Sequence, residues 1–290
     1  MSFSLGIVAG ICAALCWGIA DFLAKIIVDR LGKNGDLKAL FWISLAGLLP
    51  LTVLFLLFGG HAGISLGMIP MLAMLGAFNF AAYYAFYRGM SKGDVSIVSP
   101  IAGSYAALTA LVAFAVLGES LGVVRVLGVL LAVVGVALTS TDLSKLRKSG
   151  FRLSAGAGEA FISLLGWGVM WALVGAWGKE LGWLLPIFGI RMVTFAIVSV
   201  FAGRIGPLSG KGLAASVLLL VAAAGVLDVS GYLLASWGMA SEMVSIVAPI
   251  SASFPIITVL LAVYFLKERL ALNQVVGIIA VVAGVVALSL

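Results

Sequence analysis

Apolar runs of about 20 residues follow one another along nearly the whole chain, separated by glycines, prolines and clusters of charge. An α-helix of that length crosses a hydrocarbon layer roughly 30 Å thick. The pattern therefore predicts an all-α integral membrane protein with ten transmembrane helices. The predicted spans lie near residues 5–28, 37–58, 67–88, 94–117, 121–140, 155–177, 182–202, 212–238, 243–266 and 271–289.

The composition agrees with this prediction and excludes other classes. Of the 290 residues, 63% are apolar and 10% are charged, whereas a soluble domain carries about 25% charge. Ten spans use about 200 residues, so no soluble domain fits beside them. The net charge of +6 is interpreted as a signal of membrane orientation. The lipid bilayer is the expected partner and nucleic acid is not.

The second half of the chain repeats the first. Residues 89–104 read GMSKGDVSIVSPIAGS and residues 238–253 read GMASEMVSIVAPISAS, which are identical at nine of sixteen positions with an offset of 149. The match continues from Thr109 to Thr258, and Trp17 matches Trp167 at an offset of 150. We expect two five-helix repeats, residues 1–140 and 155–290, joined by a basic loop at 141–154.

The distribution of basic residues predicts that the two repeats are inverted. Five is an odd number of spans, so the second repeat enters the membrane from the opposite side, as in inverted-repeat transporters. Alternate loops on one side hold fourteen Lys and Arg residues, whereas the other side has Arg125 and Lys179. Basic loops face the cytoplasm, which predicts both termini outside a multi-pass protein of the inner or plasma membrane. The fourteen are Lys25, Arg30, Lys33, Lys38, Arg88, Lys92, Lys145, Arg147, Lys148, Arg152, Arg204, Lys211, Lys267 and Arg269.

Metal and cofactor chemistry is not expected. The chain has one histidine, His61, and two cysteines, Cys12 and Cys16, which we interpret as small packing groups inside the first span. Metal sites draw on clusters of His, Cys and carboxylates, and no Walker A sequence is present. The first residues lack a basic segment and a cleavage site, so no signal peptide is expected.

Both repeats resemble a known family at their ends. Residues 117–138, LGESLGVVRVLGVLLAVVGVAL, and residues 266–288, LKERLALNQVVGIIAVVAGVVAL, are similar to the Glu-x₈-Gly-x₆-Gly ending of the EamA-type drug/metabolite transporters. Trp-Gly in the first and sixth spans, Pro100 and Pro249 fit the same pattern. The resemblance implies ten helices around a pocket built mainly by the first, third, fourth, sixth, eighth and ninth, with the fifth and tenth at the periphery.

Two features depart from the family pattern. An Arg early in the second and seventh helices is common in the family; here the seventh span has Arg191, but position 42 in the second is Trp. The family also implies cytoplasmic termini, contrary to the count of basic residues. The resemblance places Arg191 outside the main pocket, where a structural partner is expected.

Charges inside the spans are the first candidate site residues, because each is costly at mid-membrane. Asp21 and Lys25 lie one turn apart and form either an internal ion pair or a cavity-lining pair that contacts substrate or exchanges a proton. Asp228 is deeper and matches Asn79 at an offset of 149. With no cation within two turns on its own helix, burial favours its neutral form, so Asp228 is the proton-coupling candidate. Glu119 and Glu268 are expected to cap the fifth and tenth helices.

Prolines and aromatic residues complete the predicted pocket. Pro100 and Pro249 free backbone carbonyls, and the serines that flank them either satisfy these carbonyls or line a polar pocket. The alternative is that the prolines only kink their helices for packing. Tyrosines and tryptophans could line the pocket or lie in interface belts. The predicted substrate-binding set is Trp17, Asp21, Asn79, Tyr83, Ser104, Tyr105, Trp167, Trp171, Asp228, Tyr232 and Ser253.

These observations favour a secondary transporter, an exporter of small amphipathic metabolites such as amino acids, working by alternating access around a central pocket. The alternative is a facilitated-diffusion carrier or channel for small solutes. A membrane receptor or enzyme is disfavoured because no catalytic constellation or extramembrane domain is present. The oligomeric state is left open, with a monomer as the simplest expectation.

Overall fold

The computed structural model describes residues 5–59, 66–117, 122–139, 143, 153–181, 184–204, 214–241, 247 and 250–287. The described residues form a bundle of helices with short connections and no extended β-strand. The helices of the first repeat are α1 Leu5–Leu31, α2 Gly35–Phe58, α3 Met68–Lys92, α4 Val95–Gly103, α5 Tyr105–Leu117 and α6 Val123–Thr139. Those of the second are α8 Ala157–Leu181, α9 Leu185–Arg204, α10 Ala215–Ser241, α12 Pro255–Leu261, the π-helix η1 Ala262–Leu266 and α13 Leu272–Ala287.

Seven helices in the described ranges are long and apolar enough to cross a membrane. They are Leu5–Leu31, Gly35–Phe58, Met68–Lys92, Val95–Val112, Ala157–Val174, Leu185–Arg204 and Ala215–Gly238. Three shorter apolar helices, Val123–Thr139, Ile250–Leu266 and Leu272–Ala287, coincide with the remaining predicted spans. The all-α membrane class is confirmed, and the count of ten spans stays a prediction. Pro249, Glu119 and most of the 141–154 loop lie outside the described residues.

The fourth predicted span and its counterpart in the second repeat are broken helices. Ser104 separates α4 from α5, and a turn at Ser253 and Phe254 precedes α12. At each break the serine hydroxyl donates to the carbonyl three residues earlier, Ser104 Oγ to Ile101 O at 2.6 Å and Ser253 Oγ to Ile250 O at 2.6 Å. These hydroxyls satisfy carbonyls that a continuous helix would bond to amides.

The two repeats exchange equivalent contacts. Thr109 Oγ1 donates to Gly168 O at 3.0 Å, and its repeat equivalent Thr258 donates to Gly18 O at 3.2 Å. The glycines allow this approach, because a Cβ at Gly18 would lie 2.5 Å from the Cβ of Ile257, and one at Gly168 would lie 2.8 Å from the Cβ of Leu108. Each repeat therefore packs its first helix on the broken helix of the other, which is the pattern of a twofold relation.

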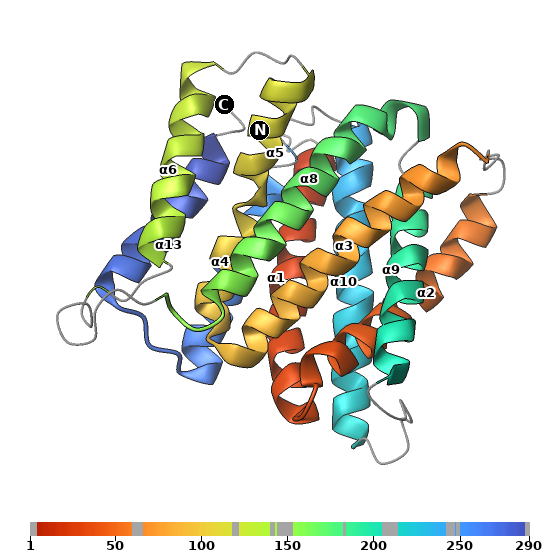
Figure 1. The fold of residues 1–290 in the computed structure, drawn as a ribbon, viewed down its shortest axis with the longest axis horizontal. Helices are drawn as coiled ribbons and strands as arrows, with labels where there is room; N and C mark the ends of the chain where they lie inside the picture. The colour runs from red at the N-terminus through yellow and green to blue at the C-terminus, as the bar shows by residue number, and fades with distance from the viewer. Residues whose placement is uncertain are drawn as a thin grey trace.

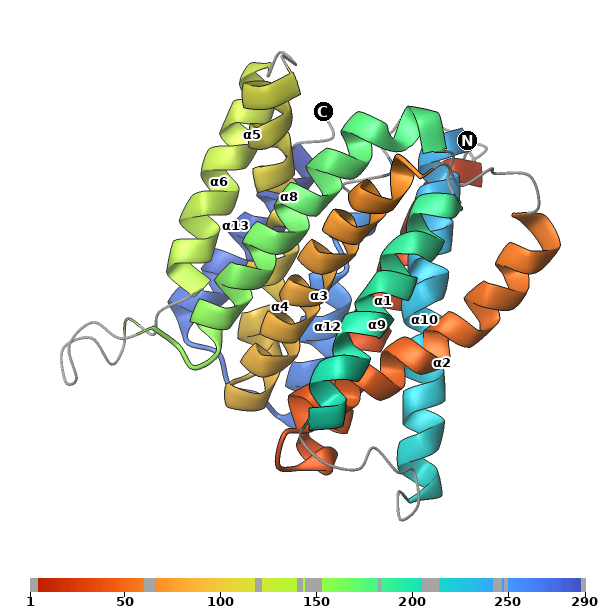
Figure 2. The same ribbon diagram turned by 45° about the vertical axis from the view of Figure 1, so that its right-hand side comes forward.

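Helices α6 and α13 lie side by side at one edge of the bundle, while α1, α3, α4, α8 and α10 occupy the centre (Figures 1 and 2). Gly135 and Gly277 bring the two edge helices into backbone contact: a Cβ at Gly135 would lie 2.7 Å from Gly277 O. The fifth and tenth predicted spans are thus peripheral, as expected.

Polar contacts gather at one end of the bundle. Figure 1 marks the N- and C-termini at the opposite end. Arg88 Nη1 lies 3.0 Å from Asp36 Oδ2, and Lys92 pairs with Glu159 at the start of α8. Glu268 accepts from the amides of Val95 at 3.1 Å and Ser96 at 2.9 Å. Glu268 therefore caps α4 of the first repeat, and the prediction that it caps the tenth helix is wrong.

Candidate functional site

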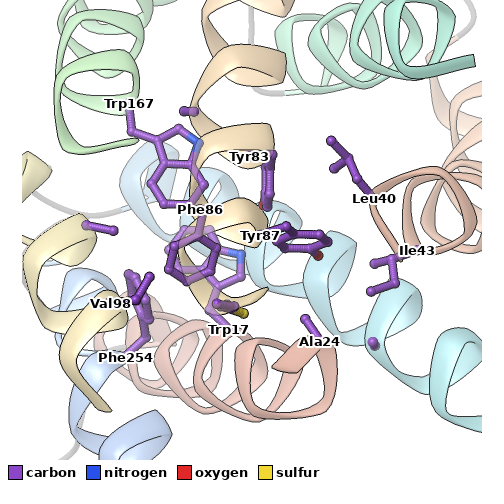
Figure 3. Close-up of a cluster of buried hydrophobic side chains, with 14 of the residues drawn as sticks. Trp17, Ala24, Leu40, Ile43, Tyr83, Phe86, Tyr87, Val98, Trp167 and Phe254 are labelled. Atoms are coloured by element: carbon purple, nitrogen blue, oxygen red, sulfur yellow. The ribbon is translucent and has the colours of Figure 1, made fainter. Parts of the chain in front are cut away.

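A cavity lies at the centre of the bundle, where the two repeats meet. Figure 3 shows Trp17 from α1, Tyr83 from α3, Trp167 from α8 and Phe254 turned toward this interior. The eight lining residues are Trp17, Asp21, Tyr83, Tyr105, Trp167, Trp171, Tyr232 and Phe254. They form four pairs of repeat-equivalent positions at offsets of 149 or 150: Trp17 and Trp167, Asp21 and Trp171, Tyr83 and Tyr232, Tyr105 and Phe254.

The aromatic side chains hold one another in place around this space. Trp17 meets Tyr232 edge-on at 5.2 Å between ring centroids, and Trp167 meets Tyr83 in the same way at 4.9 Å. Trp171 stacks on Tyr232 at 5.7 Å and on Tyr105 at 6.5 Å. Such ring pairs add about 0.5–1.5 kcal/mol each beyond the area they bury, so the cavity wall is a connected aromatic shell.

A buried ion pair lies directly behind Tyr83 and Tyr232. Arg191 Nη2 lies 2.6 Å from Asp228 Oδ2, and both side chains are more than nine-tenths buried. Tyr83 donates to Asp228 Oδ1 at 2.8 Å, and the guanidinium carbon stands 4.2 Å from the Tyr232 ring centroid. Opposite charges and a hydroxyl donor balance Asp228 inside the bundle.

This pairing corrects the reasoning about Asp228. Its own helix has no cation within two turns, as the sequence shows, but Arg191 of α9 supplies one at 2.6 Å. The reason for assigning proton coupling to Asp228 is thereby removed. Arg191 does have a structural partner, as predicted, and it lies beside the cavity rather than remote from it.

Asn79, the repeat equivalent of Asp228, anchors the other side of the aromatic shell. Its amide oxygen accepts from Trp167 Nε1 at 3.2 Å and from Tyr232 Oη at 3.3 Å, while its nitrogen donates to Thr194 Oγ1 at 3.0 Å. Trp17 Nε1 donates to the backbone oxygen of Asp228 at 3.2 Å. The two tryptophans are therefore held from equivalent positions, Trp17 by residue 228 and Trp167 by residue 79.

Asp21 differs from the other lining residues because it carries a carboxylate. Its Oδ2 accepts from Ser99 Oγ at 3.4 Å. The alternative in which Lys25 pairs with Asp21 is wrong: Lys25 Nζ lies 3.1 Å from Asp29 Oδ1 and 2.7 Å from Met90 O. Asp21 therefore faces the cavity with a neutral hydroxyl as its hydrogen-bond partner.

The structure brings together most of the predicted set. Trp17, Asp21, Tyr83, Tyr105, Trp167, Trp171 and Tyr232 line the cavity, and Asn79 and Asp228 lie immediately behind it. Ser104 and Ser253 bond their own helices at the breaks and are outside the lining. The sequence analysis missed Phe254, although its equivalence to Tyr105 at offset 149 was a usable signal. It also missed Thr194, for which no sequence signal existed.

The cavity is small as it stands. About 20 Å³ is open to the centre of a water molecule, which is space for about one or two waters. A metabolite needs a pocket of roughly 300 Å³ or more, so the aromatic wall must part to admit one. No group of three or more His, Cys, Asp or Glu side chains gathers in the described part of the chain.

Apolar spans arranged as two repeats around a central cavity are the architecture of a membrane transporter. The model of the EamA-like transporter family matches residues 4–141 and 158–290, one match for each repeat. The chain therefore belongs to the EamA-like transporter family, whose members are membrane transporters rather than enzymes.

A solved structure agrees with the fold, and a further relative matches part of the chain. A crystal structure of a protein with 17% sequence identity superposes with a TM-score of 0.67, covering 99% of this chain and 96% of that one. A protein of Methanocaldococcus jannaschii named uncharacterized protein MJ1333.1 is 43% identical over 65 residues. That match spans 22% of this chain and 47% of the relative, about half of its length.

Proposed function

We propose that this protein is a secondary transporter that exports small amphipathic metabolites, such as amino acids, by alternating access around the central cavity. The observation that carries the proposal is the cavity wall, in which four pairs of repeat-equivalent residues line one space where the two repeats meet. A site on such a pseudo-twofold can be reached from either side when the repeats rock against each other.

The broken helices support the same mechanism. Transporters commonly bind substrate beside discontinuous helices near the bilayer midplane. Here the breaks at Ser104 and Ser253 each stand next to a cavity residue, Tyr105 and Phe254. A Cβ at Gly103 would lie 2.5 Å from Pro255 Cγ, so the two breaks touch. A hinge at these points would move the cavity wall directly.

The alternative is a facilitated-diffusion carrier or channel. A channel needs a continuous polar path, whereas this cavity is walled mainly by aromatic rings that close on one another. A carrier without ion coupling keeps the same site and the same alternating access. Receptor or enzyme activity has no support beyond the presence of a cavity.

Transport can be tested in proteoliposomes preloaded with unlabelled mixtures of amino acids and small organic amines. We expect counterflow of a radiolabelled member of these mixtures, with loss of most activity in Trp167→Ala because this removes the shared contact of Tyr83, Tyr105 and Asn79. Phe58→Leu is the matched control, since Phe58 is 73% exposed on α2. Counterflow that is equal in empty and protein-containing liposomes would overturn the proposal.

A further inference from the structure

The lining of the cavity combines seven aromatic rings with one carboxylate. From this we propose that the substrate is an organic ammonium ion with an apolar body, bound with its nitrogen at Asp21 and its body between the rings. The inference rests on the proposed transport function and narrows its substrate class. Among the described residues that line the cavity, Asp21 is the only one with a carboxylate or a basic group.

Counted as formal charges, the groups around the cavity leave one negative charge without a cation. Asp228 and Arg191 neutralise each other at 2.6 Å, and Lys25 is drawn to Asp29. Asp21 is left with the Ser99 hydroxyl at 3.4 Å. A carboxylate in low-dielectric surroundings needs a cation or a proton to balance it. An ammonium ion entering the cavity supplies that balance, whereas a carboxylate entering it would meet like charge.

The aromatic rings fit an ammonium group better than a metal ion. Electron-rich faces of Trp and Tyr attract ammonium groups within about 6 Å, and this attraction is strongest when water is excluded. The structure already contains a cation–π contact of this type, because the Arg191 guanidinium carbon lies 4.2 Å from the centroid of the Tyr232 ring. Hard metal cations require about six oxygen ligands, which a lining of indole, phenyl and phenol rings does not provide.

The asymmetry between the repeats sets the position of the ligand. The repeat equivalents are Asp21 and Trp171, so the twofold relation places a carboxylate on one side of the cavity and an indole on the other. Trp171 stacks between Tyr105 and Tyr232. The ligand therefore has its nitrogen toward α1 and its apolar body toward α8.

A zwitterionic amino acid fits less well than the amine made by removing its carboxylate. Its amino group can meet Asp21, but its carboxylate finds no free cation in the described lining. Arg191 is held by Asp228 behind the tyrosines, and Lys25 is held by Asp29 and Met90 O. The unpaired carboxylate would be desolvated without compensation.

Four ligands of matched size test the assignment: 2-phenylethylamine, 2-phenylethanol, phenylalanine and 3-phenylpropionate. Binding is measured by titration calorimetry on the full chain in lipid nanodiscs. We expect the amine to bind about tenfold or more tightly than the alcohol and phenylalanine, with 3-phenylpropionate weakest. Tighter binding of phenylalanine or 3-phenylpropionate than of the amine, or binding of none of the four, would overturn the assignment.

Two variants and their controls locate the site. Asp21→Asn should erase the preference for amine over alcohol, whereas Asp94→Asn, exposed at the start of α4 and away from the cavity lining, should keep it. Trp171→Leu should weaken amine binding and Phe58→Leu should not. An amine preference that survives Asp21→Asn contradicts the proposal. A reversed ranking beside intact counterflow removes the amine assignment alone. Counterflow that is absent for amino acids and also for 2-phenylethylamine removes the transport function whatever the ranking.

Discussion

The Arg191–Asp228 pair is the most highly constrained feature at the scale of single residues. Both side chains are buried, and two tyrosines contact them: the Tyr83 hydroxyl donates to Asp228 and accepts from Arg191, and the Tyr232 ring lies against the guanidinium. Trp17 donates to the backbone oxygen of Asp228. A buried ion pair contributes little net stability when compared with a well-packed apolar pair, but a single unpaired member is costly. The pair therefore fixes the orientation of the two tyrosines that face the cavity.

This account predicts that Arg191→Met destabilises the protein by about 3–5 kcal/mol, because Asp228 is left buried and unpaired. The double variant Arg191→Met with Asp228→Asn should recover part of that loss. Arg204→Met, at the exposed end of the same helix, is the control and should change stability by less than about 0.5 kcal/mol. Denaturant unfolding in detergent micelles measures all three, and a double variant less stable than Arg191→Met would contradict the assignment.

At the scale of helices, close contacts between glycines and the opposite repeat determine how the cavity is enclosed. Gly18 lets α1 approach α12, and Gly47 lets α2 approach α10, where a Cβ would lie 2.7 Å from Gly225 O. Apolar periodicity is weak in helices that are apolar on every side. For this reason the spans could be predicted from the sequence, while their partners could not. The internal repeat was more informative about contacts than the apolar pattern, because equivalent positions at offset 149 predict equivalent contacts.

The broken helices show where the sequence analysis stopped short. Pro100 indicated a disturbance in the fourth span, but the actual break falls four residues later at Ser104, where backbone amide and hydroxyl bonds to earlier carbonyls end α4. The partner of Glu268 was also out of reach, because a cap on the other repeat depends on tertiary packing. The aromatic cavity residues could be found, since Trp17, Trp167, Tyr83 and Tyr232 occupy equivalent positions.

Gly18→Ala tests the contact between repeats. The new methyl would overlap Ile257 and lie 2.9 Å from Phe254 O, so we expect a loss of about 1–3 kcal/mol from overpacking. Gly203→Ala in α9 is the matched control, because nothing lies within 4 Å of its added Cβ. Thermal unfolding followed by circular dichroism distinguishes them. Equal melting temperatures for the two variants would show that α1 and α12 do not pack as described.

At the scale of the whole molecule, the distribution of charge makes the two ends of the bundle different. One end holds the Arg88–Asp36 and Lys92–Glu159 pairs and the Glu268 cap, and the other holds the two chain ends. Basic residues in connecting loops favour the cytoplasmic side. The protein is therefore proposed to keep both termini outside, in contrast to the precedent of the family.

Orientation can be measured with cysteines placed in a background of Cys12→Ala and Cys16→Ala. Cysteine at Lys33, in the turn between α1 and α2, should resist membrane-impermeant thiol reagents in intact cells. Cysteine at Leu66, which is 85% exposed before α3, should be labelled readily. The opposite pattern would place both termini in the cytoplasm and overturn the prediction from basic residues.

The central claim is that the two repeats rock around one cavity, and a cross-link between them tests it most directly. In the same background, cysteines at Lys92 and Glu159 join α3 of the first repeat to α8 of the second, and cysteines at Asp36 and Arg88 join two helices within the first. Counterflow is measured before and after treatment with a short bifunctional thiol reagent. The account predicts that the 92–159 cross-link stops counterflow while the 36–88 cross-link leaves most of it. Undiminished counterflow in fully cross-linked 92–159 protein would contradict movement of one repeat against the other.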